Sequence, residues 1–266
     1  MNILDKIVAN TQGEVAARKS LVSIAELEKS PLFNRTPLVV KDFIRDPAKS
    51  GIIAEIKKKS PSKGIINDKI DVVEVGVGYE AAGASCISCL TEFEFFGGKM
   101  EYLTAVKKAV NIPVLRKDFM VEDYQVIEAK AIGADMILLI AACLTPAELE
   151  NLAKLAKSLG LSVLMEVHDE EELARSINPY LDLVGVNNRN LKTFDVSVET
   201  SIRLADLIPN EFLKVSESGL TDVSVIPILK AAGYEAFLIG ETFMREENPA
   251  KCLEEYIGKM KGESRR

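Results

Sequence analysis

Residues 51–62 read Gly-Ile-Ile-Ala-Glu-Ile-Lys-Lys-Lys-Ser-Pro-Ser, an apolar strand pattern that ends in charged residues and a turn. Side chains alternate faces along a strand, so Glu55 and Lys57 share a face with Ile53. Two opposite charges on a face that begins as core cost desolvation energy unless they pair or bind something. The Ser-Pro-Ser segment turns the chain and offers hydroxyl and N–H groups. This arrangement is typical of an active site at the mouth of a barrel.

Short apolar runs like this one alternate with longer amphipathic stretches along the whole chain. Pro146–Leu159, for example, keeps its apolar side chains on one stripe, begins with a proline and is followed by Gly160, as is typical of a helix. A series of such strand–helix units over about 250 residues predicts an α/β fold, the (β/α)8 TIM barrel. We expect strands at residues 51–56, 85–90, 114–116, 136–140, 162–167, 183–187, 213–216 and 236–239.

An open, doubly wound sheet would show the same alternation. Two features favour the barrel: no Gly-x-Gly-x-x-Gly follows the first strand, and polar residues stand at the ends of many strands. Residues 1–48 read as a helical extension, over Leu4–Leu27 and Pro31–Arg45, that packs on the barrel. Because no linker interrupts the pattern, we expect residues 1–266 to form a single domain.

Composition narrows the function classes. A net charge of −7 over 266 residues argues against a nucleic-acid-binding surface, although the basic residues 57–59 suit a small anionic ligand. No apolar run reaches the roughly 18 residues of a membrane span, and the N-terminal residues lack a signal-peptide pattern. We therefore expect a cytoplasmic protein with no membrane partner.

Cys86 and Cys89 form a Cys-x-x-Cys pair, which could indicate metal or redox chemistry. They lie in one expected strand, where positions three apart face opposite sides. No second pair stands at zinc spacing, and His168 is the single histidine. We interpret the two cysteines as small buried apolar side chains.

The expected strand ends carry a ring of polar side chains, and TIM-barrel active sites lie at these ends. Several share a face with core residues, as Glu166 does with Leu164 and Glu217 with Val215. A single charged strand end is usually a solvated rim, but charges on the inward side of most strands predict a site. The ring contains acids and bases without a Ser-His-Asp arrangement. Its members are Glu55, Lys57, Glu92, Lys117, Glu166, Asn187, Arg189, Glu217 and Ser218.

Lys117 stands out in this ring because lysine among glutamates in a partly dry cavity suits proton transfer. Burial lowers a lysine pKa and carboxylates raise it, so the sequence leaves the net direction open. An internal ion pair with Asp118 or another rim acid is the alternative. Separately, Gly219 and Gly240 follow the seventh and eighth strands, where TIM barrels bind phosphate, and predict a phosphate site.

Taken together, these residues resemble the indole-3-glycerol phosphate synthase family of tryptophan biosynthesis. The likeness covers essentially the whole chain, including the N-terminal helical segment. It implies a carboxy-lyase that converts 1-(2-carboxyphenylamino)-1-deoxy-D-ribulose 5-phosphate to indole-3-glycerol phosphate, carbon dioxide and water, with no cofactor and no metal. The motifs that carry it are residues 54–64, 115–119, 165–169, 185–191, 216–219 and 237–242.

The resemblance also implies roles for the polar side chains at the strand ends. Lys117 would be the general acid of ring closure, and Glu166, Glu55 and Lys57 the acid–base groups of the later steps. Which of these groups makes each proton transfer stays open, because coupled groups share their titrations. Lys57 could instead hold the substrate carboxylate. Asn187, Glu217 and Ser218 would orient the substrate hydroxyls and Lys117.

The remaining assignments concern binding. The resemblance implies that Ser60, Gly219 and Gly240 surround the phosphate, with Glu241 beside them and Arg189 in support. His168 is expected to have no catalytic role. The substrate ring should lie against apolar residues near the strand ends, for which the candidates are Phe93, Phe95, Phe96, Phe119 and Leu139.

Two other functions agree less well with these residues. A barrel similar to phosphoribosylanthranilate isomerase would also bind phosphate, but its Amadori chemistry uses a Cys/Asp-type pair that the ring does not supply. A binding or scaffold subunit would show eroded polar strand ends, and none is eroded here. We expect a small phosphorylated substrate and a monomer that could associate with other tryptophan-pathway enzymes. The loop over residues 58–66 could close on the substrate.

Overall fold

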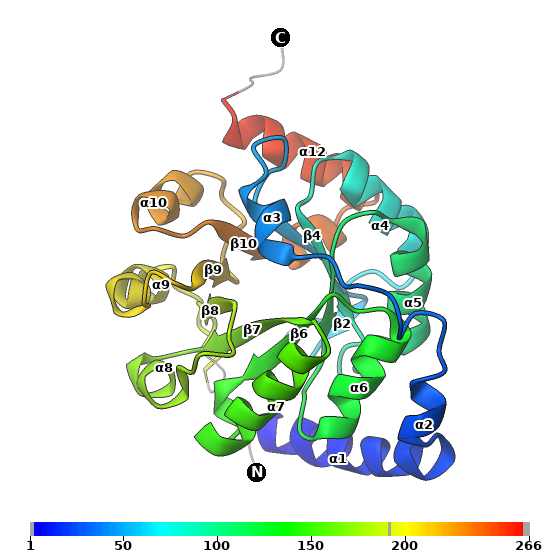
Figure 1. Ribbon diagram of the computed structural model, residues 1–266. Coiled ribbons are helices and arrows are strands. Elements are labelled where there is room, and N and C mark those ends of the chain that lie inside the picture. The colour runs from blue at the N-terminus through cyan, green and yellow to red at the C-terminus, as the bar shows by residue number, and fades with distance from the viewer. Residues whose placement is uncertain (1–2, 191–192, 263–266) are drawn as a thin grey trace.

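A closed barrel of parallel strands forms the centre of the computed structural model, which describes residues 3–190 and 193–262 (Figure 1). Its last strand pairs with its first, so the prediction of a TIM barrel is confirmed and an open sheet is excluded. Every expected strand is present, with ends within one residue of the prediction. The strands are β1 (Ile52–Ile56), β4 (Cys86–Leu90), β5 (Val114–Lys117), β6 (Met136–Ile140), β7 (Ser162–Val167), β8 (Leu183–Asn187), β9 (Leu213–Glu217) and β10 (Ala236–Ile239).

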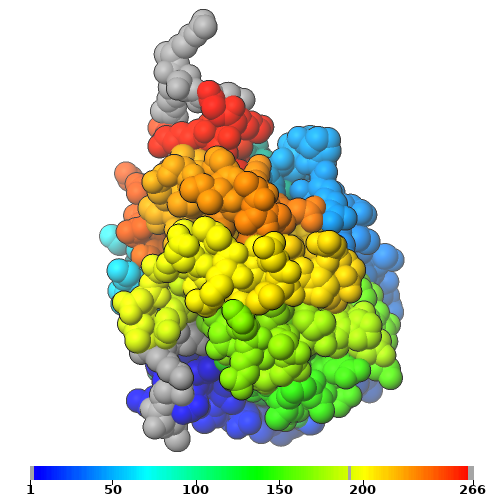
Figure 2. Space-filling model, turned by 90° about the vertical axis from the view of Figure 1, so that its left-hand side faces the viewer, coloured from blue at the N-terminus to red at the C-terminus, as the bar shows by residue number. Residues whose placement is uncertain are grey.

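Helices surround the barrel, and Figure 2 shows successive chain segments from green to orange side by side across one outer face. The predicted helix at 146–159 is α7, which ends at Ser158; Thr145 and Glu148 form a capping box at its start. The outer helices are α4 (Val72–Ala81), α5 (Met100–Ala109), α6 (Asp123–Ile132), α7 (Pro146–Ser158), α8 (Glu170–Ser176), α9 (Glu199–Leu204), α10 (Val225–Ala231) and α12 (Pro249–Met260).

Shorter elements occupy the loops at the ends of the strands. After β1 the chain forms a small hairpin of β2 (Lys59–Ser60) and β3 (Gly64–Ile65), which the sequence analysis treated as a loop. After β10 it forms α11 (Glu241–Met244). Within the described residues, 3-10 helices are η1 (Ala141–Cys143) and η2 (Ala205–Leu207).

Strand parity divides the core into two apolar layers. Ile53 lies inside the barrel with residues such as Leu115 and Leu164, whereas Ile52 and Ala54 pack in the outer layer, against the helices. Glu55 follows Ile53 on the inward row, as predicted, so its carboxylate emerges at the carboxyl end of the barrel. The same alternation explains the cysteines of β4.

Cys86 lies in the inner layer and Cys89 in the outer layer, both fully buried and free. Burial raises the pKa of the Cys89 thiol to about 12. The interpretation of this pair as small buried apolar side chains is therefore confirmed. Among the described residues, no group of three or more His, Cys, Asp or Glu side chains is arranged to hold a metal ion.

In the described part of the chain before the barrel lie the helices α1 (Ile3–Leu21), α2 (Ile24–Leu27) and α3 (Val40–Arg45). The predicted helix over Leu4–Leu27 is interrupted at Ser23, which caps α2. The prediction of a helix over Pro31–Arg45 is wrong before Val40. Pro37 disfavours helical backbone at the residue before it, and the Leu38 N–H donates to the Asp135 carboxylate instead of to a helical carbonyl.

The N-terminal segment packs closely on the barrel. Ile7 of α1 and Val40 and Ile44 of α3 belong to the same buried cluster as the inner strand residues. In Figure 1, α1 runs along the lower edge of the molecule and α3 lies over the centre of the barrel. We therefore propose that the chain forms one domain. No helix among the described residues combines the length and the apolar character needed to cross a membrane.

A buried ion-pair network ties α1 to the barrel. Arg116 on β5 is fully buried and donates from Nη2 to Asp118 at 2.9 Å and to Glu128 of α6 at 2.8 Å. Glu128 in turn accepts from Arg18 of α1 at 2.9 Å. The network fixes α1, α6 and the strand that carries Lys117 relative to one another.

Replacing Arg116 should be strongly destabilising. Arg116→Ala leaves the buried Asp118 carboxylate without its cation, so we expect the free energy of unfolding to fall by about 3–5 kcal/mol in urea denaturation. Arg203→Ala is the control, since its pair with Glu170 is 4.0 Å long and largely exposed; it should cost less than about 1 kcal/mol. Similar losses in the two variants would contradict this account.

Candidate active site

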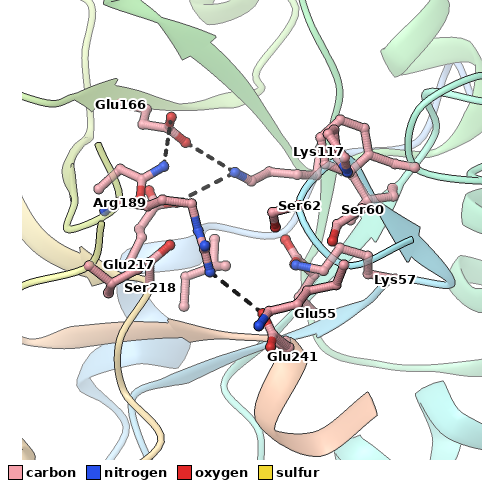
Figure 3. A pocket seen from close by; sticks show the side chains of 18 of the residues that line it. Glu55, Lys57, Ser60, Ser62, Lys117, Glu166, Arg189, Glu217, Ser218 and Glu241 are labelled. Carbon is pink, nitrogen blue, oxygen red and sulfur yellow. Dashed lines mark hydrogen bonds and ion pairs between the residues drawn. The ribbon is translucent and has the colours of Figure 1, made fainter. Parts of the chain in front are cut away.

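A cavity of about 470 Å³ opens at the carboxyl ends of the barrel strands (Figure 3). Its lining brings together every residue to which the family resemblance gave a catalytic or phosphate-binding role, together with Phe119. They come from strands on all sides of the barrel, as expected for a TIM barrel. These residues are Glu55, Lys57, Ser60, Lys117, Phe119, Glu166, Asn187, Arg189, Glu217, Ser218, Gly219, Gly240 and Glu241.

Lys117, the last residue of β5, points into the middle of the cavity. Its Nζ lies 3.1 Å from Glu166 Oε2 and 3.4 Å from Glu217 Oε2. Asp118 is held by Arg116, so the ion pair of Lys117 forms with acids of β7 and β9 and not with Asp118. Burial disfavours the ammonium group, but Glu166, Glu217 and Glu55 outweigh it and raise the pKa of Lys117 well above its ordinary value.

Glu166 on β7 is a buried carboxylate with donors on both oxygens. Oε2 accepts from Lys117, and Oε1 accepts from Asn187 Nδ2 at 3.1 Å. His168 Nε2 also lies 3.3 Å from Oε1. Burial alone would raise the pKa of Glu166, but Lys117, His168 and Asn187 together lower it well below its usual range. Glu166 is therefore ionised.

Glu217 on β9 has the opposite environment. It is 2% exposed, and its Oε1 has no hydrogen-bond partner among the described residues. Burial and the charges of Glu166 and Glu55 raise the pKa of Glu217 to about 8, against the attraction of Lys117. Of the two carboxyl groups that share Lys117, Glu217 is therefore the one that holds a proton at neutral pH.

Glu55 and Lys57 form the ion pair that their shared strand face predicted. Lys57 Nζ lies 2.7 Å from Glu55 Oε1, and Ser88 Oγ donates to Oε2 at 3.5 Å. Burial opposes the charge of Glu55, but Lys57 and then Lys117 lower the pKa of the carboxyl group below its usual value. The cavity thus holds two ammonium groups among three buried carboxyl groups.

Two glycines make room for these carboxyl groups. A Cβ built on Gly185 of β8 would lie 2.2 Å from Glu217 Oε1, and one on Gly240 would lie 2.5 Å from Glu55 Oε1. Gly240 was assigned to the phosphate; the structure also places the Glu55 carboxylate directly against it. Gly185 was not among the predicted site residues. Its signal was present, because a glycine inside a strand often marks a close approach.

The loop after β9 presents backbone to the cavity. Ser218 and Gly219 have φ values of 66° and 75°, so the backbone turns in the left-handed region where it lines the cavity. Asn188 fixes this turn by donating to the Ser218 carbonyl at 3.1 Å. Ser60 Oγ, from the β2 hairpin, is buried and has no hydrogen-bond partner in the described part of the chain.

Arg189 and Glu241 cross the mouth of the cavity. Arg189 follows β8, Glu241 begins α11, and their Nη2 and Oε2 atoms are 3.5 Å apart (Figure 3). Both side chains are about one-fifth exposed. This pair links the segments that follow β8 and β10 across the cavity lining.

An apolar wall lines another part of the cavity. Phe119 packs against Phe96, with ring centroids 5.9 Å apart, beside Leu138 and Ile140 of β6. The first turns of α1 complete this wall with Ile3, Leu4 and Ile7. These α1 residues were not among the predicted site residues, because only the tertiary packing of that helix brings them to the strand ends.

Three apolar candidates and one acid were wrongly placed. Leu139 faces the outer helices, because the inward row of β6 is Leu138 and Ile140. Phe93 and Phe95 do not line the cavity, and Phe93 is 55% exposed. Glu92 accepts backbone N–H groups of residues 94–96 and so closes the turn after β4 instead of entering the site.

The fold is similar to that of solved structures. Among them are 3-hexulose-6-phosphate synthase from Salmonella typhimurium, with a TM-score of 0.61, and KGPDC from Streptococcus mutans, with a TM-score of 0.62. Each is 11% identical and covers 79% of this chain; the matches span 99% and 97% of those chains. At this identity the likeness shows the barrel fold alone.

The amino-acid sequence is similar to one family over most of its length. The family model described as Indole-3-glycerol phosphate synthase matches residues 4–256. Curated relatives named indole-3-glycerol phosphate synthase include that of Bacteroides thetaiotaomicron, 43% identical over 96% of this chain and 98% of the relative. That of Ruminiclostridium cellulolyticum is 48% identical over 91% and 94%, and that of Koribacter versatilis 46% over 96% and 98%. The chain belongs to the indole-3-glycerol phosphate synthase family.

Proposed function

We propose that this cavity carries out the indole-3-glycerol phosphate synthase reaction, with Lys117 as the proton donor. The substrate, 1-(2-carboxyphenylamino)-1-deoxy-D-ribulose 5-phosphate, has an aromatic ring with a carboxylate, a hydroxylated chain and a phosphate. The observation that carries the proposal is the Lys117 ammonium group, held between Glu166 and Glu217 inside the cavity. The apolar wall suits the ring, and the turn at Ser218 and Gly219 suits the phosphate.

Ring closure needs a proton at the ketone oxygen. An aromatic carbon attacks the ketone carbon, the C=O bond breaks toward oxygen, and the developing alkoxide must be neutralised. Lys117 supplies this proton because its neighbouring carboxylates keep it in the ammonium form. Glu217 also holds a proton and contacts Lys117, so the Lys117–Glu217 pair carries a second proton close to the ketone oxygen's binding position.

Decarboxylation and dehydration follow. Loss of carbon dioxide leaves its bonding electrons in the ring. The hydroxyl group then leaves as water with the second proton of the Lys117–Glu217 pair, while one proton is removed from the new ring. Glu166 is the base for that removal because hydrogen bonds from Lys117 and Asn187 and the nearby His168 keep it ionised. Lys57, paired with Glu55 at the cavity wall, can hold the substrate carboxylate until it departs.

Further proposals concern substrate binding, cellular location and oligomeric state. Ser60, Gly219 and Gly240 contact the phosphate, Asn187 and Ser218 orient the hydroxylated chain, and Phe119 packs on the ring, since all of them line one cavity. Arg189 and Glu241 shape its entrance. We also propose that the enzyme works in the cytoplasm as a monomer, free or associated with other tryptophan-pathway enzymes.

Replacing Lys117 should stop turnover while substrate still binds. Lys117→Met removes the donated proton and keeps most of the side-chain volume, so we expect the rate to fall by about 10²–10⁴-fold or more. Product formation is followed by indole fluorescence, and substrate binding by calorimetry. Lys154→Met, at an exposed position on α7, is the matched control and should retain full activity. Turnover by Lys117→Met close to that control would remove Lys117 from this role.

The raised pKa of Glu217 also predicts a pH dependence of stability. Between its ordinary value of 4.5 and its folded value of about 8, the folded protein binds more protons at Glu217 than the unfolded chain does. Raising the pH through this window therefore destabilises the native protein. Glu217→Gln mimics the neutral acid and lacks this loss, so its Tm relative to the native protein should rise from pH 5 to pH 9.

Thermal unfolding at one-unit pH steps measures this difference. Glu170→Gln is the control, because Glu170 is 62% exposed; its Tm difference should stay nearly constant with pH. A constant or falling difference for Glu217→Gln would show that folding does not raise the pKa of Glu217.

A further inference from the structure

The imidazole of His168 lies behind the catalytic cavity and does not line it. Its side chain is 11% exposed and connects two carboxylates. Nε2 lies 3.3 Å from Glu166 Oε1, an ion-pair contact without the alignment of a hydrogen bond. Nδ1 lies 3.1 Å from Oε2 of Glu172 on α8, and the same oxygen accepts the His168 backbone N–H at 2.8 Å. Glu172 thus anchors both the backbone and the ring.

This geometry favours a charged imidazole ring. A neutral imidazole has one N–H and one lone pair, so one ring nitrogen would place its lone pair against a carboxylate oxygen. An imidazolium offers N–H groups to both carboxylates. Burial disfavours the cation, but Glu166 and Glu172 raise the pKa of His168 to about 10.

Other groups packed nearby do not change this conclusion. Cys143 of η1 lies within electrostatic range of Glu166 and Glu172, and burial raises the pKa of its thiol, so it stays neutral. Asp5 of α1 acts on the same thiol. Lys117 and Asn187 occupy the remaining sides of the Glu166 carboxylate.

We propose that His168 is a positioning residue for Glu166: as an imidazolium anchored on Glu172, it holds Oε1, keeps the carboxylate ionised and leaves Oε2 directed at Lys117. The inference rests on the proposed role of Glu166 as the base. His168 itself touches no substrate in this account. Without its charge, Glu166 keeps only Lys117 and Asn187, and Lys117 is shared with Glu217. The proton held by Glu217 could then move to Glu166 and inactivate the base.

The charge state of His168 can be measured without any substrate. The chain contains one histidine, so a protein labelled with ¹⁵N-histidine gives a single imidazole signal set. We expect long-range ¹H–¹⁵N correlation spectra to show both ring nitrogens protonated at pH 8, with a midpoint near pH 10. Glu172→Gln should lower that midpoint by one pH unit or more, about a tenfold change in proton affinity. A neutral ring at pH 8 in the native protein would overturn the inference.

The second test follows the ionisation of the Glu166 carboxyl group through the pH dependence of catalysis. His168→Gln keeps a polar side chain of similar reach but no charge, and His168→Leu removes both. We expect both variants to lose kcat with little change in KM, and the acidic limb of the kcat profile to move to higher pH, more in His168→Leu than in His168→Gln. Glu172→Gln, which leaves the histidine in place, should move the limb in the same direction and serves if the His168 variants fold poorly.

These outcomes separate the inference from the proposed function. An unchanged acidic limb in folded, active variants would overturn the positioning role of His168, while synthase activity would still support the proposed function. Absence of synthase activity in the native protein would instead refute the proposed function. The NMR measurement would then still decide whether His168 is charged.

Discussion

The ammonium group of Lys117 is the charge on which the cavity depends. Glu166, Glu217 and Glu55 are each almost completely buried, and burial of three carboxyl groups, two of them ionised, at one barrel mouth is tolerable only with cations among them. Lys117 contacts two of them directly, and Lys57 pairs with the third. The unequal donors around Glu166 and Glu217 then leave one carboxyl group ionised and the other protonated, so a base and an acid stand beside one lysine at neutral pH.

The barrel makes this arrangement possible through strand parity and through glycine. Inward rows of apolar residues end in polar groups around the barrel, so the charged side chains meet at the mouth with packed core beneath them. Gly185 and Gly240 leave space where the carboxyl groups of Glu217 and Glu55 lie. The network of Arg116, the residue before Lys117 on β5, fixes α1 so that its first turns can close the apolar wall. The strand alternation, the two glycines and the Arg116 network therefore shape both the fold and the site.

Much of this was predictable from sequence because it depends on local patterns. The strands, their inward rows and the Glu55–Lys57 pair follow from alternation along short apolar runs. What could not be predicted depends on contacts between distant segments. The wall formed by α1 requires its docking on the barrel, and the non-helical path before Val40 depends partly on Asp135, which lies 97 residues after Leu38. Two further misses are local: Leu139 was misplaced by one position in the strand alternation, and the role we propose for His168 depends on Glu172, four residues later, lying beside its imidazole.

The most direct test of the central claim is the ionisation of Lys117 itself. Protein labelled with ¹³C at the lysine Cε positions can be titrated by NMR, and the Lys117 signal is assigned by its loss in Lys117→Met. If the buried carboxylates control this lysine, it stays an ammonium group at and above the ordinary lysine pKa of about 10.4. A midpoint well below that value would mean that desolvation outweighs the carboxylates, and would contradict the account of Lys117 as the proton donor.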